Sequence, residues 1–119
     1  MRFLQQGKAG TPATTKARGD AGEDEALACL QDQGLRLLQR NYRTPGRGGG
    51  EIDLIMQAPD GTVDFGGAGA SIGRTKQQRI VFAARHYLMR WRRMPPTRFD
   101  VVLIDGGAPV WLQAAFDAA

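Results

Sequence analysis

Residues Gly48 to Met56 read G-G-G-E-I-D-L-I-M and place two carboxylates close together. The pattern predicts a glycine-rich turn and then a strand, with three apolar side chains on one face and Glu51 and Asp53 on the other. Carboxylates on a mostly buried strand need a compensating cation, and a divalent metal with oxygen ligands is one candidate. A half-exposed edge strand with solvated acids explains the same pattern, and the motif alone does not separate the two interpretations.

Two further charged residues lie on helix faces that should be apolar. Glu23 shares the inward face of a helix expected over Ala21 to Gln33, where an acid also suits the positive end of the helix dipole. Lys76 lies one turn before Ile80 on the inward face of a helix expected over Arg74 to Arg92. It is either a cation of an active site or a lysine whose ammonium reaches solvent.

The elements that must position these residues predict an α/β protein. Strands are expected over Leu35–Arg43, Glu51–Gln57, Phe99–Ile104 and Val110–Leu112. A further strand should begin at Thr62 and stop almost at once, because residues 64–73 contain four glycines and indicate a flexible loop. The order of helices and strands predicts a mixed sheet flanked by helices.

The length of 119 residues predicts one domain over residues 21–119, preceded by a mobile basic arm over residues 1–20. Sixteen lysines and arginines against twelve acids give a net charge of +4, which makes nucleic acid the first partner to consider. With no signal peptide and no segment that could span a bilayer, we expect a cytoplasmic location and no membrane partner.

Metal chemistry in this chain must depend on carboxylates. Cys29 is the only cysteine and His86 the only histidine, which excludes a disulfide within one chain and a cysteine-rich zinc site. Cys29 is expected to be a small helix residue without a catalytic role.

Five motifs together resemble one protein family: Gly22-Glu23, Arg40-Asn41-Tyr42-Arg43, Gly50-Glu51-Ile52-Asp53-Leu54-Ile55, Lys76 with Arg79-Ile80, and Arg98-Phe99-Asp100-Val101-Val102. The chain resembles the YraN family, also called UPF0102, from Gly22 to Phe116. Its members are small bacterial proteins with a restriction-endonuclease-like fold, similar to archaeal Holliday-junction resolvases. The resemblance implies a three-layer α/β/α fold with a central mixed sheet. It also implies a metal-dependent endonuclease that hydrolyses DNA phosphodiesters, with branched DNA as a candidate substrate.

The resemblance also assigns roles to individual positions. Glu23, Asp53 and Lys76 match the catalytic residues, Asp53 and Glu23 being the ligands of Mg²⁺ or Mn²⁺, and Glu51 matches a supporting acid. Such a metal would activate water and neutralise charge on the scissile phosphate. We expect the nucleic-acid backbone to be held by arginines: Arg40, Arg43, Arg47, Arg74 and Arg79.

The resemblance is interrupted between Val63 and Asp64. There the family carries a strand reading approximately V-F-V-E-V-K-x-R, whose Glu and Lys complete the site, whereas this chain has no Glu-x-Lys between Asp53 and Lys76. Either the protein has residues that this sequence omits, or the site lacks its second carboxylate, so whether the chain is an active enzyme stays open. The alternatives are a non-catalytic nucleic-acid-binding module and a protein-interaction module that uses Phe82 and Met89. A homodimer is also left open.

Overall fold

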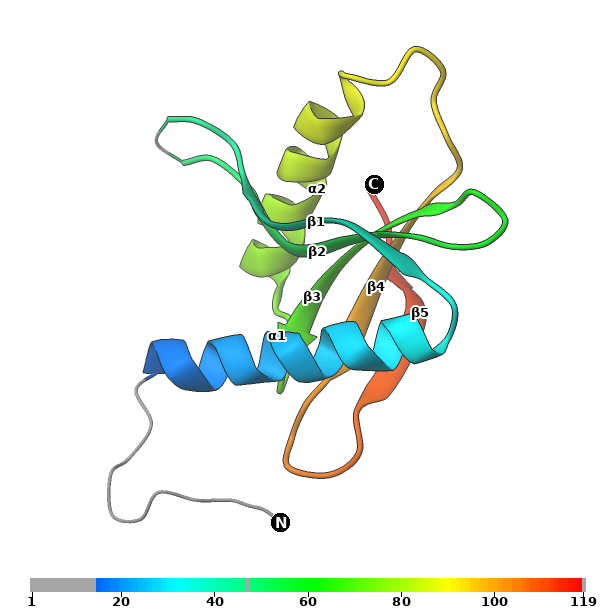
Figure 1. Ribbon diagram of the computed structural model, residues 1–119. Coiled ribbons are helices and arrows are strands. Elements are labelled where there is room, and N and C mark those ends of the chain that lie inside the picture. The colour runs from blue at the N-terminus through cyan, green and yellow to red at the C-terminus, as the bar shows by residue number, and fades with distance from the viewer. Residues whose placement is uncertain (1–14, 47, 119) are drawn as a thin grey trace.

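A five-stranded mixed sheet lies between two helices (Figure 1). The computed structural model describes residues 15–46 and 48–118, with side chains from Ala21 onward. The elements are α1 (Thr15–Asp32), β1 (Arg36–Arg43), β2 (Glu51–Gln57), β3 (Val63–Gly69), α2 (Arg74–Leu88), β4 (Thr97–Leu103) and β5 (Val110–Phe116). The strands lie in chain order, and only β3 and β4 run parallel, since α2 carries the chain across between them. The predicted α/β class with a mixed sheet is confirmed.

Each helix covers its own apolar cluster. Leu54 and Met56 of β2 pack with Ala26 and Leu30 of α1. On the other side, Ile55 of β2 belongs to a cluster with the predicted inward face of α2, which consists of Ile80, Ala83, Ala84 and Tyr87. The two clusters bury the two faces of the sheet, as the alternation of side chains in a strand requires.

One part of the predicted face pattern is wrong. Ile52 does not join Leu54 and Met56 but packs in the α2 cluster together with Tyr42, its partner across β1 and β2. Asn41 beside this pair has a positive φ of 54°, which turns β1 between Arg40 and Tyr42. A prediction that assigns alternate residues of a strand to opposite faces cannot anticipate such a turn within the strand.

The predicted loop over residues 64–73 is also wrong in its first half. Val63–Gly69 forms β3, which pairs with β2 on one side and β4 on the other and is therefore central in the sheet. Glycine weakens a strand on its own, but here both neighbouring strands need hydrogen-bond partners. Gly66 also sits where a Cβ would lie 3.2 Å from the carbonyl oxygen of Asp100, so a small residue suits this close approach.

Both helices have boundaries that differ from the predicted ones. Helix α1 begins at Thr15, within the range predicted as an arm, while residues 1–14 of that prediction lie outside the described residues. It ends as expected before Gly34, whose φ of 93° suits a helix stop. Helix α2 ends at Leu88, four residues before the predicted Arg92, and hydrogen-bonded turns continue to Trp91. Neither of these two helices of the described residues is long and apolar enough to cross a membrane.

The turn between β1 and β2 is held against α2 by close packing at Gly50. A Cβ on this residue would lie 2.3 Å from the carbonyl oxygen of Arg79 and 2.6 Å from the amide nitrogen of Ala83. Thr44 fixes the other side of the turn, because its hydroxyl accepts a 2.7 Å hydrogen bond from the Gly50 amide. This contact sets the start of β2 beside the second and third turns of α2.

Candidate functional site

The carboxylate of Asp53 and the ammonium of Lys76 form an ion pair between β2 and the first turn of α2. Lys76 Nζ lies 2.9 Å from Asp53 Oδ2, and the same oxygen accepts a 3.1 Å hydrogen bond from the Ala68 amide of β3. The Asp53 side chain is 8% exposed, whereas the Lys76 side chain is 37% exposed. Two residues that the sequence picked out separately are thus brought together, and the cation is the partner that remains accessible.

Glu51 emerges beside this pair and also contacts basic side chains. Its carboxylate lies 3.6 Å from Arg79 Nη1 of α2 and 4.0 Å from Arg43 Nη2 of β1. The Arg79 and Arg43 side chains are 55% and 77% exposed, so solvent and other anions reach them easily. Both carboxylates of the predicted pair therefore contact cations. The acids are Glu51 and Asp53, and their basic partners are Lys76, Arg79 and Arg43.

The third predicted acid, Glu23, has a different partner. Glu23 is largely buried on α1, as its predicted inward face requires, and its Oε1 lies 3.5 Å from Arg40 Nε of β1. Arg40 Nη2 also lies 2.6 Å from Asp24 Oδ1, and the two carboxylates raise the pKa of this guanidinium, the hydrogen bond that Arg40 donates to Asp24 being the largest cause. Arg40, one of the arginines expected to bind nucleic acid, therefore pairs with two acids of α1.

A divalent metal needs several oxygen ligands, and the described residues do not supply them at Asp53. No group of three or more aspartate, glutamate, histidine or cysteine side chains that could hold a metal occurs in the described part of the chain. The position of β3 that faces Asp53 is Gly67, whose added Cβ would lie 3.3 Å from Asp53 Oδ2 and 2.7 Å from Ile72 Cδ1. Gly67 therefore offers no second carboxylate beside Asp53. The residues present therefore do not fit a Mg²⁺ or Mn²⁺ centre on Asp53 and Glu23.

The surface around Lys76 can hold an anion. A hollow of about 370 Å³ opens at the start of α2, lined by Lys76, Arg79, Thr75, Gly73 and Glu51. Gly73 caps the helix without any side-chain hydrogen bond, so the first amides of α2 point outward with the positive end of the helix dipole. Cations and helix amides without a side-chain cap at one place favour phosphate or carboxylate groups.

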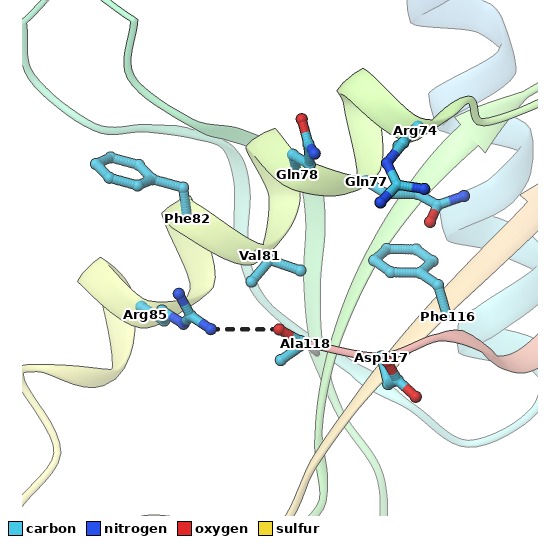
Figure 2. Close-up of a pocket in the computed structure, with 9 residues that line it drawn as sticks. All are labelled: Arg74, Gln77, Gln78, Val81, Phe82, Arg85, Phe116, Asp117 and Ala118. Atoms are coloured by element: carbon cyan, nitrogen blue, oxygen red, sulfur yellow. Dashed lines mark hydrogen bonds between the residues drawn. The ribbon is translucent and has the colours of Figure 1, made fainter.

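A second, larger groove lies along the same helix. It has a volume of about 470 Å³ and runs between α2 and the end of β5 (Figure 2). Arg74 and Arg85 of α2 line it together with Phe82, whose side chain is left 54% exposed. Of the other arginines expected to bind nucleic acid, Arg43 and Arg79 are exposed and both contact Glu51, and Arg47 lies outside the described residues.

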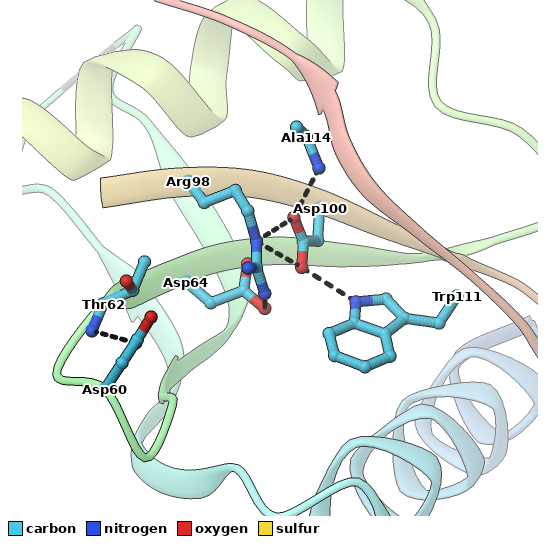
Figure 3. A network of polar contacts seen from close by, with 7 residues as sticks. All are labelled: Asp60, Thr62, Asp64, Arg98, Asp100, Trp111 and Ala114. Atoms are coloured by element: carbon cyan, nitrogen blue, oxygen red, sulfur yellow. Dashed lines mark hydrogen bonds and ion pairs between the residues drawn. The ribbon is translucent and has the colours of Figure 1, made fainter. Parts of the chain in front are cut away.

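A separate polar network is buried on the sheet and was not predicted (Figure 3). The Asp100 carboxylate of β4 accepts hydrogen bonds from Arg98 Nε at 2.9 Å, from Trp111 Nε1 at 2.8 Å and from the Ala114 amide at 2.8 Å. The β4–β5 ladder shifts register between Phe99 and Val101, and Ala114 has a positive φ of 50°. Asp100 therefore satisfies a backbone group that this irregular pairing would otherwise leave without a partner.

Asp64 of β3 lies beside the same network but has no hydrogen bond of this kind to Arg98. It is 1% exposed, and Arg98 Nη2 lies 3.7 Å from its Oδ2, beyond hydrogen-bonding distance. Burial, followed by the neighbouring Asp100, raises the pKa of the Asp64 carboxyl to about 9. Asp64 is therefore protonated and neutral at physiological pH, which is the form that a dry environment favours.

Comparison with known proteins assigns the chain to a family. The profile of the uncharacterised protein family UPF0102 matches residues 22–104. The chain belongs to the UPF0102 family. A UPF0102 protein of Paracidovorax citrulli (strain AAC00-1) is 63% identical, over 94% of this chain and 91% of its own length. One of Albidiferax ferrireducens (strain ATCC BAA-621 / DSM 15236 / T118) is 65% identical, over 88% of this chain and 91% of its own length.

The relatives carry residues that this UPF0102 chain lacks. The alignment with the Paracidovorax citrulli protein extends over 123 positions, which is more than the 119 residues of this chain, so it includes gaps in this chain. The alignment with the Polaromonas naphthalenivorans (strain CJ2) protein, 56% identical over 89% of this chain and 82% of its own length, extends over 126 positions. These gaps agree with the expectation that a stretch of the family is absent here, while β3 shows that the central strand position is nevertheless filled.

The buried network has a partial signature in the sequence. Arg98 and Asp100 are two residues apart on one strand, so both side chains point to the same face. An acid inside the otherwise apolar strand over Phe99–Ile104 must have a buried partner. Asp64 has no such signature, because the glycines that follow it indicate a loop, where an acid needs no buried partner.

Proposed function

We propose that this UPF0102 protein binds nucleic acid through its phosphate backbone, using the exposed cations of α2 and of the adjacent β1–β2 turn. The observation that carries the proposal is the charge of α2 and its surroundings. Between Asp64 and Asp100 the chain contains eight lysines and arginines and no acid. Most of these cations are exposed, and a predominantly basic surface of this kind attracts a polyanion by electrostatics and by release of the counterions that it carries.

The first turns of α2 are the place where a phosphate fits best. Lys76 and Arg79 line the hollow at the helix start, Arg43 lies against Glu51 of its lining, and the amides of that turn have no capping side chain. Arginine can bind two phosphate oxygens at once, while the Lys76 ammonium acts as a point charge. Asp53 neutralises part of the lysine charge but is itself buried beneath it. Lys76 is thus held in place and still accessible to a ligand.

The residues of this chain suit the binding of phosphate better than metal-dependent hydrolysis. Asp53 is a single carboxylate that already has a cation at 2.9 Å, and Gly67 faces it in place of an acid. The three-layer arrangement of α1, sheet and α2 supports a kinship with restriction-endonuclease-like folds. In this proposal the fold presents a phosphate-binding surface without assembling the metal ligands.

The test is a titration of the full chain with a labelled DNA duplex at increasing salt. We expect the logarithm of the affinity to fall linearly with the logarithm of the salt concentration. The double variant Arg43→Gln/Arg79→Gln should bind about tenfold more weakly and lower the salt slope by about two. Arg36→Gln is the control, because Arg36 lies at the opposite end of the β1–β2 ladder and pairs with Gln57.

Two results would contradict the proposed function. The first is the absence of binding to any nucleic acid at low salt. The second is an equal loss of affinity per charge in the control and in the double variant, which would show that net charge alone matters.

A further inference from the structure

The groove between α2 and the end of β5 combines features that the proposed function does not use. Its walls carry two arginines, two glutamines and two aromatic rings: Arg74, Arg85, Gln77, Gln78, Phe82 and Phe116. Phe82 is 54% exposed on a helix whose other exposed side chains in the groove are polar or basic. An exposed ring and guanidinium groups on one helix are the combination that binds a base by stacking and its phosphates by charge.

We infer that this groove binds an unpaired nucleotide, whose base stacks on Phe82 while Arg74 and Arg85 hold the flanking phosphates. The inference rests on the proposed function and adds its substrate class, namely a strand with at least one base out of the duplex. The volume of about 470 Å³ lies within the range of small-molecule sites, so one nucleotide can be accommodated. Gln77 and Gln78 offer amide groups that can donate to or accept from a base edge.

The hydrogen bonds of the groove leave its cations available. Arg85 donates to the carbonyl oxygen of Ala118 at 3.3 Å through Nη2, and a guanidinium has further N–H groups for a phosphate. Asp117 also lines the groove, but Figure 2 shows its side chain pointing away from α2 and from both arginines. Phe116 is fixed by stacking on Phe99, with ring centroids 5.2 Å apart, so this wall is rigid.

Charge favours a nucleic acid over a second copy of the chain as the occupant. The protein carries a net charge of +4, and α2 has basic residues and no acid. Two such faces would repel each other, whereas a strand of phosphates is attracted to either. The groove also lies on the same helix as the hollow at Lys76, so one strand can contact both.

The test compares a single-stranded DNA oligonucleotide that contains 2-aminopurine with its matched duplex. Stacking on an aromatic ring changes the fluorescence of this base, so the wild type should change the signal on binding the single strand. Phe82→Ala should lower the single-strand affinity by roughly tenfold and abolish the fluorescence change per bound strand. Its affinity for the duplex should stay within about twofold. Phe82→Trp, which keeps a stacking surface, should retain both the affinity and the fluorescence change.

Met89→Ala is the matched control. Met89 is 80% exposed at the end of the same helix but does not line the groove, so its removal should change neither signal. Phe82 is exposed, and thermal unfolding should confirm that Phe82→Ala remains as stable as the wild type to within about 0.5 kcal/mol.

The outcomes separate the inference from the proposed function. If the wild type binds both DNA forms and Phe82→Ala changes neither the affinity nor the fluorescence, the inference is wrong and the proposed function stands. If the wild type binds no nucleic acid, both are wrong. Self-association that Phe82→Ala weakens, with unchanged single-strand binding, would identify the groove as a protein interface and overturn the inference.

Discussion

Asp53 and Asp100 both pair with a basic residue, yet the two pairs are built in opposite ways. At Asp53 the carboxylate is buried and the Lys76 ammonium is 37% exposed, with one further hydrogen bond from the Ala68 amide. At Asp100 both members are largely enclosed, and the carboxylate also receives the Trp111 indole and the Ala114 amide. The first pair presents a cation to solvent, whereas the second connects β4 to β5.

The difference shows how exposure decides what an ion pair can do. A half-exposed pair contributes little to stability, because water and salt screen it, and its cation can exchange the carboxylate for a ligand. A buried, fully hydrogen-bonded carboxylate cannot be lost without leaving several polar groups unsatisfied. We therefore assign binding to the Asp53–Lys76 pair and structural integrity to the Asp100 network.

The largest expected effect is the loss of Asp100. Asp100→Ala should lower the free energy of unfolding by about 3 kcal/mol or more, since Arg98, Trp111 and the Ala114 amide all lose their acceptor. Urea unfolding followed by circular dichroism measures this change, and Asp100→Asn, which keeps an acceptor oxygen, should lose less. Asp105→Ala, at an exposed acid, should change the free energy by about 0.5 kcal/mol or less. Similar small losses at both positions would contradict the structural role of the network.

The next effect concerns pH and the buried Asp64 carboxyl. Its pKa is raised from 3.8 to about 9 in the folded chain, so the folded state holds a proton that the unfolded state releases. The stability that comes from neutral Asp64 is full below about pH 4 and is lost as the pH rises toward about 9. The slope is at most about 1.4 kcal/mol per pH unit. Asp64→Asn cannot ionise, so its free energy of unfolding should depend less steeply on pH than that of the wild type.

Urea midpoints at about pH 5, 7 and 8 for the wild type and Asp64→Asn measure this difference. All other titrating groups are common to both proteins, so the difference between the two slopes belongs to position 64. Parallel slopes would show that Asp64 is ionised in the folded protein.

The sequence predicts many of the helix faces and strand bounds correctly, because these depend on local periodicity. The inward faces of Glu23 and Lys76, the bounds of β2 and the buried face of α2 follow from spacing, and the structure confirms them. The partner of each charged residue did not follow, because partners are set by tertiary packing. Spacing places Lys76 on the inward face of its helix, but its partner Asp53, at 2.9 Å, follows only from the packing of α2 on β2.

The main error in the predicted fold, at β3, has a physical reason. Four glycines between residues 64 and 73 indicate a loop when they are considered alone. In the folded chain this segment pairs with β2 and β4 at once, and the hydrogen bonds of two neighbouring strands outweigh the low strand preference of glycine. The same error concealed Asp64, because an acid in a loop needs no buried partner.

The most direct test of the binding role is Asp53→Asn, assayed with labelled duplex DNA in the presence and absence of Mn²⁺. The substitution removes a negative charge beneath Lys76 and leaves the half-exposed ammonium free, so the unfolding free energy should change by only about 1 kcal/mol. We expect Asp53→Asn to bind DNA about threefold more tightly than the wild type, and Mn²⁺ to cause no cleavage by either protein. Mn²⁺-dependent cleavage by the wild type that Asp53→Asn abolishes would contradict the account and make Asp53 a catalytic residue.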